Sequence, residues 1–561
     1  MFIKYFKLIL IITFFYQSPL YSKSRALNNF NSHYFSNYLS GIIAYENKNN
    51  SEALDFFKSS KFLIDKHQPY FERYIYSLVL ENNVKSAAKE IKKNLGKNNP
   101  KFFEAFLIMS LDSLKKKDFR ESKDYLVQAS EHINNDEYAA IIYETLNQYL
   151  HLFKENEILE TKKNFGNLSL ITEVFQKCYL DDTNIQKYFN ILLNNNDGDY
   201  SRYIFFNIHY LIKKEKFEEA QLIANQLDYL KSSLLISQGK KWIEEKKLEK
   251  FSKIFSCKDS NDIVSEFIFL IANLYSSQNN YEKSNFYLNI SYFLNPKFKF
   301  NQSLIAENYY LNENYKKAKK TLEYFNEKDD IYYWFKIKKQ AQIISKESSE
   351  EESLNFINKK FNTIKNPSIK MIFDIANFNK NSKKYQKAIT YYDQVISKIE
   401  INSDGYADIL YRRGSCYERL GNYAKSDKDF LKSLEINPDN AYVLNYLAYS
   451  WLERKYKIDK AILMLKKAYA ERSNDPYIID SIGWGFYLIG DYLKAEVFLK
   501  KALELMPYDP IVNDHYGDIL WKLDRKIQAR YFWNSVLDLK ETEETMKKDI
   551  NFKLLEGLKN L

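Results

Sequence analysis

The sequence predicts an all-α protein, an α-solenoid of stacked helix pairs, on three observations. The 561 residues include only 13 glycines and 9 prolines, and 45% of them are hydrophobic, so residues that break helices are few. Apolar residues recur at helical spacing along most of the chain. Small residues also recur at steps of 34, 35 and 34, at Gly414, Ala448, Gly483 and Gly517. A fixed period near 34 residues indicates repeats of one helix pair each.

The order of residues within each copy explains how its two helices can pack. After the first small residue come a second small residue, a bulky residue and a third small or apolar residue. These positions hold Ser426, Ala461, Ala495 and Ala529, then Phe430, Leu465, Leu499 and Trp533, then Ser433, Ala468, Ala502 and Val536. Small side chains let two antiparallel helices approach closely, and the bulky residue fills the space beside them. This pattern resembles the tetratricopeptide repeat (TPR), and the resemblance implies a protein-binding solenoid.

Residues 1–22 have the form of a secretory signal peptide. Lys4 and Lys7 precede a short apolar run, which is less than the roughly 20 residues that span a bilayer. We therefore expect the chain to be exported to a bacterial periplasm, with an uncleaved N-terminal anchor as the alternative.

The region 23–260 is predicted to hold degenerate N-terminal helical repeats. Gly41, Ala53 and Phe57 keep the register of the later copies. Between about 131 and 260 the helical periodicity persists while the repeat signature fades. Degenerate repeats and irregular helix pairs both remain open there.

Clearer register returns over 261–400, which is predicted to hold TPR-like repeats with a break near 327–367. The charge cluster from Lys346 to Glu352 lies in this break and indicates an exposed loop or a helix start. The well-matched block is 401–538. Residues 539–561 then place apolar residues on one face, which predicts a helix that caps the last repeat.

Charge and cysteine content exclude several classes of function. The net charge is +10, from 83 basic and 73 acidic residues mixed along the chain, so no basic face for nucleic acid is expected. Three cysteines in a chain of this length do not predict a disulfide framework. Cys416 falls within a repeat helix, where a small buried hydrophobic residue is expected.

Motifs for catalysis and for cofactors are missing from the sequence. The six histidines are never at metal-ligand spacing, and no phosphate-binding loop or nucleophile elbow occurs. We therefore expect no enzyme activity, no catalytic residues, no cofactor and no metal. An unrecognised enzyme site within 131–260 is the least favoured hypothesis.

The resemblance to TPR proteins implies that the first helix of each pair lines a concave face. In the four well-matched copies the residues expected to point into that groove are Tyr411, Ser415, Tyr442, Asn445, Tyr449, Asp480, Trp484, Tyr487, Asp514, Asp518 and Trp521. Aromatic side chains on such a wall are suited to anchor a protein or peptide partner. The aspartates favour a partner with basic or amide groups.

Residues 440–537 resemble more specifically a family of exported bacterial TPR proteins. Some members are outer-membrane lipoproteins that act as adaptors for carboxyl-terminal processing proteases. This sequence lacks the lipidated cysteine after its signal. The resemblance implies a non-catalytic periplasmic scaffold or adaptor that associates with the outer membrane through a partner. The alternative is a structural component or assembly chaperone of an outer-membrane complex.

Overall fold

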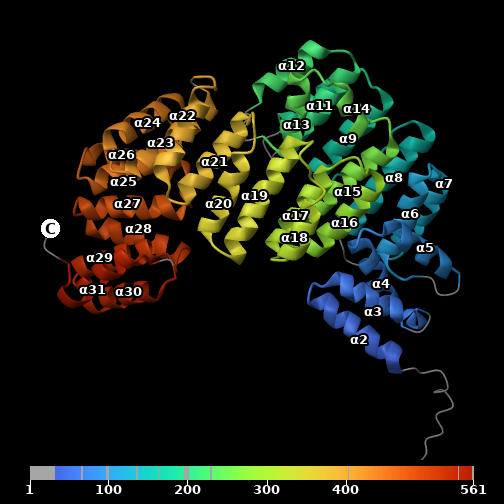
Figure 1. The fold of residues 1–561 in the computed structure, drawn as a ribbon, viewed down its shortest axis with the longest axis horizontal. Coiled ribbons are helices and arrows are strands. Elements are labelled where there is room, and N and C mark those ends of the chain that lie inside the picture. The colour runs from blue at the N-terminus through green and yellow to red at the C-terminus, as the bar shows by residue number, and fades with distance from the viewer. Residues whose placement is uncertain are drawn as a thin grey trace, which may run out of the picture. The chain divides into compact units, whose positions relative to one another are not determined.

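The computed structural model describes residues 32–64, 67–96, 100–133, 137–161, 163–194, 201–227, 230, 232–401, 403–540 and 542–558. Every regular element in these ranges is a helix (Figure 1), which confirms the predicted all-α fold. The predicted signal peptide lies outside the described residues. The chain divides into two compact units, Met1–Phe217 with Glu244–Tyr324 and Glu218–Ile243 with Phe325–Leu561.

The first unit is built from helices of unequal length. They are α2 (Ser32–Glu46), α3 (Asn50–Ser59), the 3-10 helix η1 (Lys61–Leu63), α4 (Gln68–Leu80), α5 (Val84–Asn94), α6 (Phe103–Lys115), α7 (Phe119–Ser130), α8 (Glu137–Glu155), α9 (Asn167–Leu180), α10 (Ile185–Leu193), α11 (Ser201–Lys213), α14 (Glu249–Ile254), α15 (Ser260–Ser277), α16 (Tyr281–Leu294), α17 (Phe300–Leu311) and α18 (Tyr315–Leu322). Successive helices pair at both ends of this unit, as α2 with α3, α6 with α7, α15 with α16 and α17 with α18. The middle is irregular, since α8 has 19 residues and α14 only 6. Irregular helix pairs therefore describe the middle better than uniform repeats.

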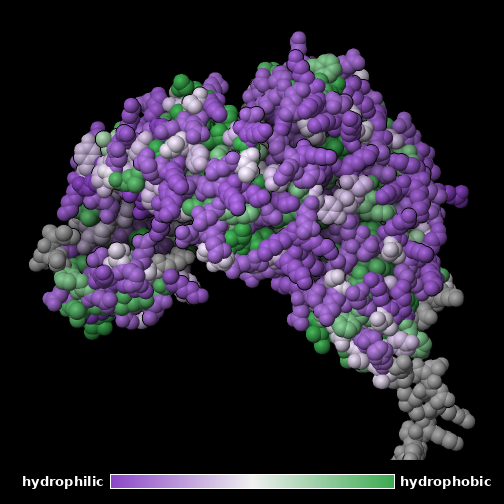
Figure 2. All heavy atoms as spheres, viewed as in Figure 1, coloured by the Kyte–Doolittle hydropathy of each residue, from purple (hydrophilic) through white to green (hydrophobic). Residues whose placement is uncertain are grey.

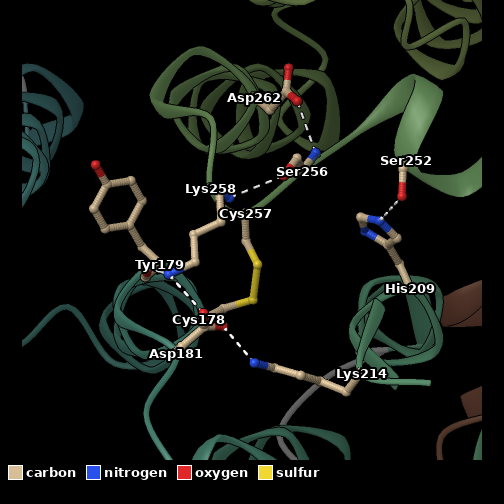
Figure 3. The surroundings of a disulfide bond; sticks show 10 residues. All are labelled: Cys178, Tyr179, Asp181, His209, Lys214, Ser252, Ser256, Cys257, Lys258 and Asp262. Carbon is tan, nitrogen blue, oxygen red and sulfur yellow. Dashed lines mark hydrogen bonds and ion pairs between the residues drawn. A yellow bond between two sulfur atoms is a disulfide. The ribbon is translucent and has the colours of Figure 1, made fainter. Parts of the chain in front are cut away.

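A disulfide bond joins Cys178 in α9 to Cys257, which lies 79 residues later and just before α15 (Figure 3). The cysteine content did not predict this bond. The chain folds back so that the segment before α15 meets α9, and distance along the sequence does not reveal this. Beside the bond, Lys214 and Lys258 pair with Asp181 at 3.1 and 3.2 Å. Cys416 is free and buried.

The second unit holds the well-matched repeats. Its helices are α12 (Phe217–Gln226), α13 (Leu234–Glu244), α19 (Asp330–Glu347), α20 (Glu350–Phe361), α21 (Ile369–Asn381), α22 (Tyr385–Ile396), α23 (Asp404–Arg419), α24 (Tyr423–Ile436), α25 (Ala441–Glu453), α26 (Ile458–Glu471), α27 (Pro476–Leu488), α28 (Tyr492–Leu505), α29 (Pro510–Lys522), α30 (Lys526–Asp538) and α31 (Glu544–Glu556). From α19 to α30 each odd-numbered helix packs against the next, and α31 packs on α30. The break in the pattern near 327–367 is thus a loss of signature within an ordinary helix pair.

Small residues at the helix crossings allow the close packing of these pairs. Ala461, Ala495 and Ala529 are fully buried. A Cβ atom placed on Gly483 would lie 2.8 Å from Leu499 Cγ, closer than carbon atoms can pack. The predicted roles of these residues as packing positions are confirmed.

The turns between paired helices need positive φ. Gly421 and Gly490 have φ values of 72° and 82° at these turns, where glycine is favoured. The next helix then starts at a side-chain cap, such as Asp491 before α28. Turn and cap together fix the antiparallel direction of the second helix.

Much of the visible surface is hydrophilic, and hydrophobic residues gather over the last helices of the second unit (Figure 2). On α30, Ile527 and Tyr531 are 88% and 70% exposed. They lie on the second helix of the pair, so they are not groove residues.

Candidate binding groove in the C-terminal repeats

A cavity of about 380 Å³ opens along the first helices of successive pairs in the second unit. Its walls come from α23, α25, α27 and the start of α29. It is lined by Tyr411, Glu418, Arg419, Tyr442, Asn445, Tyr446, Tyr449, Ser450, Glu453, Asp475, Tyr477, Ile478, Asp480, Ser481, Asp509, Ile511 and Val512. This volume is within the range of small-molecule and side-chain pockets.

Helix starts place two carboxylates at the rim of the cavity. Asp475 caps α27 by accepting hydrogen bonds from the backbone N–H groups of Tyr477 and Ile478. Asp509 caps α29 in the same way. Each precedes a proline at the first helical position, so the local sequence dictates both caps. The partial positive charge of each helix N-terminus stabilises its carboxylate.

Tyrosine side chains form much of the inner wall. Burial raises the pKa of Tyr411, and it raises the pKa of Tyr446 and Tyr449 still further, so all three are neutral phenols at physiological pH. Tyr446 donates a hydrogen bond to Glu418 at 3.2 Å. Tyr442 is 45% exposed at the mouth. The wall therefore combines aromatic faces with carboxylates.

Two polar atoms in the wall have no hydrogen-bond partner in the described residues. They are Asn445 Oδ1 and Ser450 Oγ, each almost inaccessible to solvent. Ser450 is only 5% exposed. A buried polar atom without a partner is costly, so these two atoms are an unsatisfied polar part of the wall.

Five of the predicted groove residues line this cavity, namely Tyr411, Tyr442, Asn445, Tyr449 and Asp480. The others lie elsewhere. Ser415 is buried and donates to the backbone of Arg412. Trp484 stacks on Tyr487 and on His515, with ring centroids 4.5 and 4.1 Å apart.

Asp480 lines the cavity but is paired within the protein. Its carboxylate oxygens both lie 3.0 Å from His515 Nδ1. Burial by itself would lower the pKa of His515, but the charge and hydrogen bond of Asp480 raise it above the usual value. The buried pair therefore balances its own charge.

The C-terminal segment contacts Asp514, Asp518 and Trp521, which were expected to face an open groove. Lys553 from α31 lies between the two aspartates, 2.6 Å from Asp514 and 2.8 Å from Asp518. Asp518 also accepts a hydrogen bond from Trp533. Helix α31 therefore pairs with the polar side chains of the last repeat.

Trp521 is covered by the same C-terminal segment. A Cβ atom on Gly557 would collide with the Trp521 ring, and this glycine has φ of 75°. Helices α29, α30 and α31 accordingly lie together at the end of the unit (Figure 1). No local signal in α29 shows that a segment about 40 residues later would cover it.

Sequence reasoning missed several lining residues, among them Glu418, Tyr446, Glu453, Asp475 and Asp509. Glu418 and Glu453 lie at the ends of first helices, outside the inward positions of the repeat pattern. Asp475 and Asp509 could have been found from the Asp-Pro pairs that mark helix starts.

The described residues contain neither a candidate metal site nor a candidate membrane-spanning helix. No three or more His, Cys, Asp or Glu side chains there are grouped to hold a metal ion. Nor does any helix in those ranges have the length and hydrophobicity needed to cross a membrane.

Comparison with known proteins identifies the repeat. A family model described as "Tetratricopeptide repeat" matches residues 407–440. The TPR repeat-containing protein PA4667 of Pseudomonas aeruginosa is 34% identical over 111 residues. This match covers 20% of the chain and 19% of that relative.

Three bacterial proteins are among the solved structures that are similar to parts of this chain. A TPR protein from Parabacteroides merdae covers 46% of this chain and 98% of its own, at 15% identity and a TM-score of 0.38. TTC0263 from Thermus thermophilus covers 34% and 100%, at 17% identity and a TM-score of 0.30. MamA from Desulfovibrio magneticus covers 31% and 97%, at 19% identity and a TM-score of 0.27.

The 34-residue register, the buried small residues at the helix crossings and the match over 407–440 agree with one another. The chain is thus a protein that contains tetratricopeptide repeats.

Proposed function

We propose that this protein is a non-catalytic scaffold that docks a segment of a protein partner in the cavity of its C-terminal repeats. The observation that carries the proposal is the cavity itself, with its tyrosine wall. Aromatic side chains on a rigid helical wall anchor partner residues at low entropic cost. TPR proteins bind protein partners in general, which supports the same conclusion.

The proposal places the scaffold in an exported compartment, the bacterial periplasm. The form of residues 1–22 supports export. The Cys178–Cys257 disulfide also supports it, because disulfides persist in oxidising compartments and are rare in the cytosol. Peripheral association with the outer membrane through a partner is part of this proposal.

The partner is proposed to be an envelope protease or an assembly machine. The resemblance over 440–537 to adaptors of carboxyl-terminal processing proteases favours a protease. A structural component or assembly chaperone of an outer-membrane complex is the second candidate, since it would use the same groove.

Site-specific photocrosslinking in the full-length chain tests the proposal. A benzophenone amino acid at Tyr442, at the mouth of the cavity, should crosslink to one partner in cells. The same group at Tyr531, which is 70% exposed on α30, serves as the control. Mass spectrometry identifies the partner and the crosslinked segment. Equal crosslinking to the same partner from both positions would place docking outside the groove.

A further inference from the structure

We propose that the cavity accepts a lysine or arginine side chain of the docked segment. This inference rests on the proposed function and specifies which residue of the partner the groove selects. The relevant wall groups are Glu418, Glu453 and the tyrosines around them.

The first argument is the balance of charge in the wall. Four carboxylates, those of Glu418, Glu453, Asp475 and Asp509, face a single guanidinium, that of Arg419. Arg419 lies 3.6 Å from Glu418 and is itself largely exposed. The fifth carboxylate, Asp480, is matched by His515. Helix N-termini stabilise Asp475 and Asp509, and Arg472 lies 4.8 Å from the Tyr442 ring centre. The lining residues still carry more negative than positive charge, so a cationic ligand is attracted and an anionic ligand is repelled.

The second argument is the aromatic lining. A cation gains stabilisation from tyrosine faces within about 6 Å of the ring centre. Tyr411 and Tyr446 lie with ring centroids 6.0 Å apart and nearly perpendicular planes, which makes a corner of two aromatic surfaces. Methylene groups of lysine or arginine can pack there while the charged end reaches a carboxylate.

The third argument concerns hydrogen bonding. The side chains of Glu418 and Glu453 offer a ligand only hydrogen-bond acceptors. Lysine and arginine carry only donors at their charged ends, three and five respectively. An apolar side chain would desolvate these carboxylates without giving them a further donor, which is strongly unfavourable.

The fourth argument comes from the last repeat of the same chain. There Lys553 lies between Asp514 and Asp518, 5.9 Å from the ring of Trp533. Asp514 holds the position that Asp480 holds one repeat earlier, 34 residues before it. The concave wall thus already binds one lysine with carboxylates and an aromatic ring.

A peptide library tests the inference on the full-length protein. The probes are N-acetylated hexapeptide amides whose third residue is Lys, Arg, Gln, norleucine or Glu, with mixed residues elsewhere. Retention on the immobilised protein is measured at low ionic strength. The Lys and Arg pools should be retained about tenfold more than the Gln pool, and the Glu pool least of all.

Variants of the cavity wall test which residues cause the preference for Lys and Arg. Glu418→Gln with Glu453→Gln removes charge and keeps shape, and the new amide oxygen on α25 can still accept the hydrogen bond that Trp484 donates to Glu453. This double variant should lose the preference for Lys and Arg. Glu435→Gln is the matched control, because Glu435 is exposed on α24 and outside the cavity. It should retain the preference, and circular dichroism checks that all variants fold.

The outcomes separate this inference from the proposed function. If all pools bind equally, and Tyr442→Ala with Tyr449→Ala abolishes binding, the groove docks peptides without selecting a cation and the inference is wrong. A preference that survives the double glutamine variant also overturns it. If no pool is retained, docking in the groove fails together with the inference.

Discussion

At the scale of single residues, Gly483 and Gly485 lie two positions apart on α27, yet a methyl group should destabilise the protein far more at Gly483 than at Gly485. At Gly483 it would lie 2.8 Å from Leu499 Cγ and 3.1 Å from the Leu499 backbone nitrogen, neither of which can move freely. At Gly485 its closest neighbours are the Cδ1 atoms of Ile462 and Leu465, which can rotate away. Gly483→Ala should therefore destabilise the second unit by roughly 1–3 kcal/mol.

Gly485→Ala serves as the matched substitution. It should cost little or even stabilise, because alanine favours a helix over glycine by about 1 kcal/mol. Thermal unfolding followed by circular dichroism measures both. Equal melting temperatures for the two variants would contradict the packing at the α27–α28 crossing.

His515 should give the second unit a pH-dependent stability. Its pKa is raised in the folded state by Asp480 in spite of burial, from an ordinary value of 6.5. A raised pKa contributes stability that is fully present below pH 6.5 and is lost as pH rises through the folded pKa. Asp514 and Asp518 act in the same direction on this ring.

The test compares wild type with His515→Gln in urea unfolding across pH 6 to 9. The wild type should lose stability with a slope of up to about 1.4 kcal/mol per pH unit, and the variant should lack that slope. The His515→Gln variant should be less stable at every pH because Asp480 loses its partner. The comparison therefore uses the change of stability with pH, and not the stability itself. Identical slopes would show that the pair does not titrate as described.

Residue positions set by the repeat could be predicted from the sequence, whereas their partners could not. Ala495 and Leu499 lie in the core as expected because the 34-residue register dictates their neighbours. Asp514 and Asp518 also lie in the 34-residue repeats, but their partner Lys553 lies after the last repeat. An ion pair with a residue outside the repeats cannot be recognised from the 34-residue periodicity.

At the scale of elements, α31 is held to the last repeat by a buried charge cluster. Lys553→Gln would leave Asp514 and Asp518 without a cation, in a place where Lys553 and Asp514 are 18% exposed and Asp518 is 6% exposed. Removing one partner of a buried ion pair costs about 3–5 kcal/mol. We expect a loss at the lower end of that range and fraying of α31 in hydrogen exchange.

Two further variants isolate the charge. Lys547→Gln breaks an exposed pair with Glu544 on the same helix and should change stability by less than about 0.5 kcal/mol. Adding Asp518→Asn to Lys553→Gln should restore part of the loss, because asparagine can still accept from Trp533. If the double variant is no better than Lys553→Gln alone, the cost is packing rather than unpaired charge.

Element boundaries were predictable where caps and turns occur, and less so where the signature fades. The charge cluster from Lys346 to Glu352 contains a helix start, since Ser349 caps α20. Around it the repeat signature is absent, yet α19 and α20 still pack as a pair. Two helices can pack as a pair simply by burying their apolar faces against each other. The small residues of the repeat signature are needed only where the two helices cross closely.

At the scale of the whole molecule, the two compact units each have their own core, and the segment Glu218–Ile243 belongs to the second unit. It packs there through contacts such as Gln238 with Asp329 and Lys370 with the backbone of Leu230. In a regular solenoid each helix pair packs against its neighbours in the sequence, so a segment that packs against a distant part of the chain is not expected. The sequence therefore predicted a solenoid but not this division.

Both cysteines of the disulfide belong to the first unit, although the loop between them includes Glu218–Ile243 of the second. The bond closes a loop across 79 residues, and removing such a constraint costs roughly 2–4 kcal/mol. In calorimetry, Cys178→Ser with Cys257→Ser should lower the unfolding temperature of the first unit. Gly483→Ala should instead lower that of the second, because its clash lies at the α27–α28 crossing.

Cys416→Ser is the control for the loss of a thiol, since Cys416 is buried in the second unit without a disulfide. It should leave the transition of the first unit unchanged. Reducing agent should lower the same transition in wild type as the double serine variant does, and should not change that variant further. If the cysteine variant and Gly483→Ala shift one common transition equally, the chain unfolds as a single cooperative body, and the stability of each unit depends on the other.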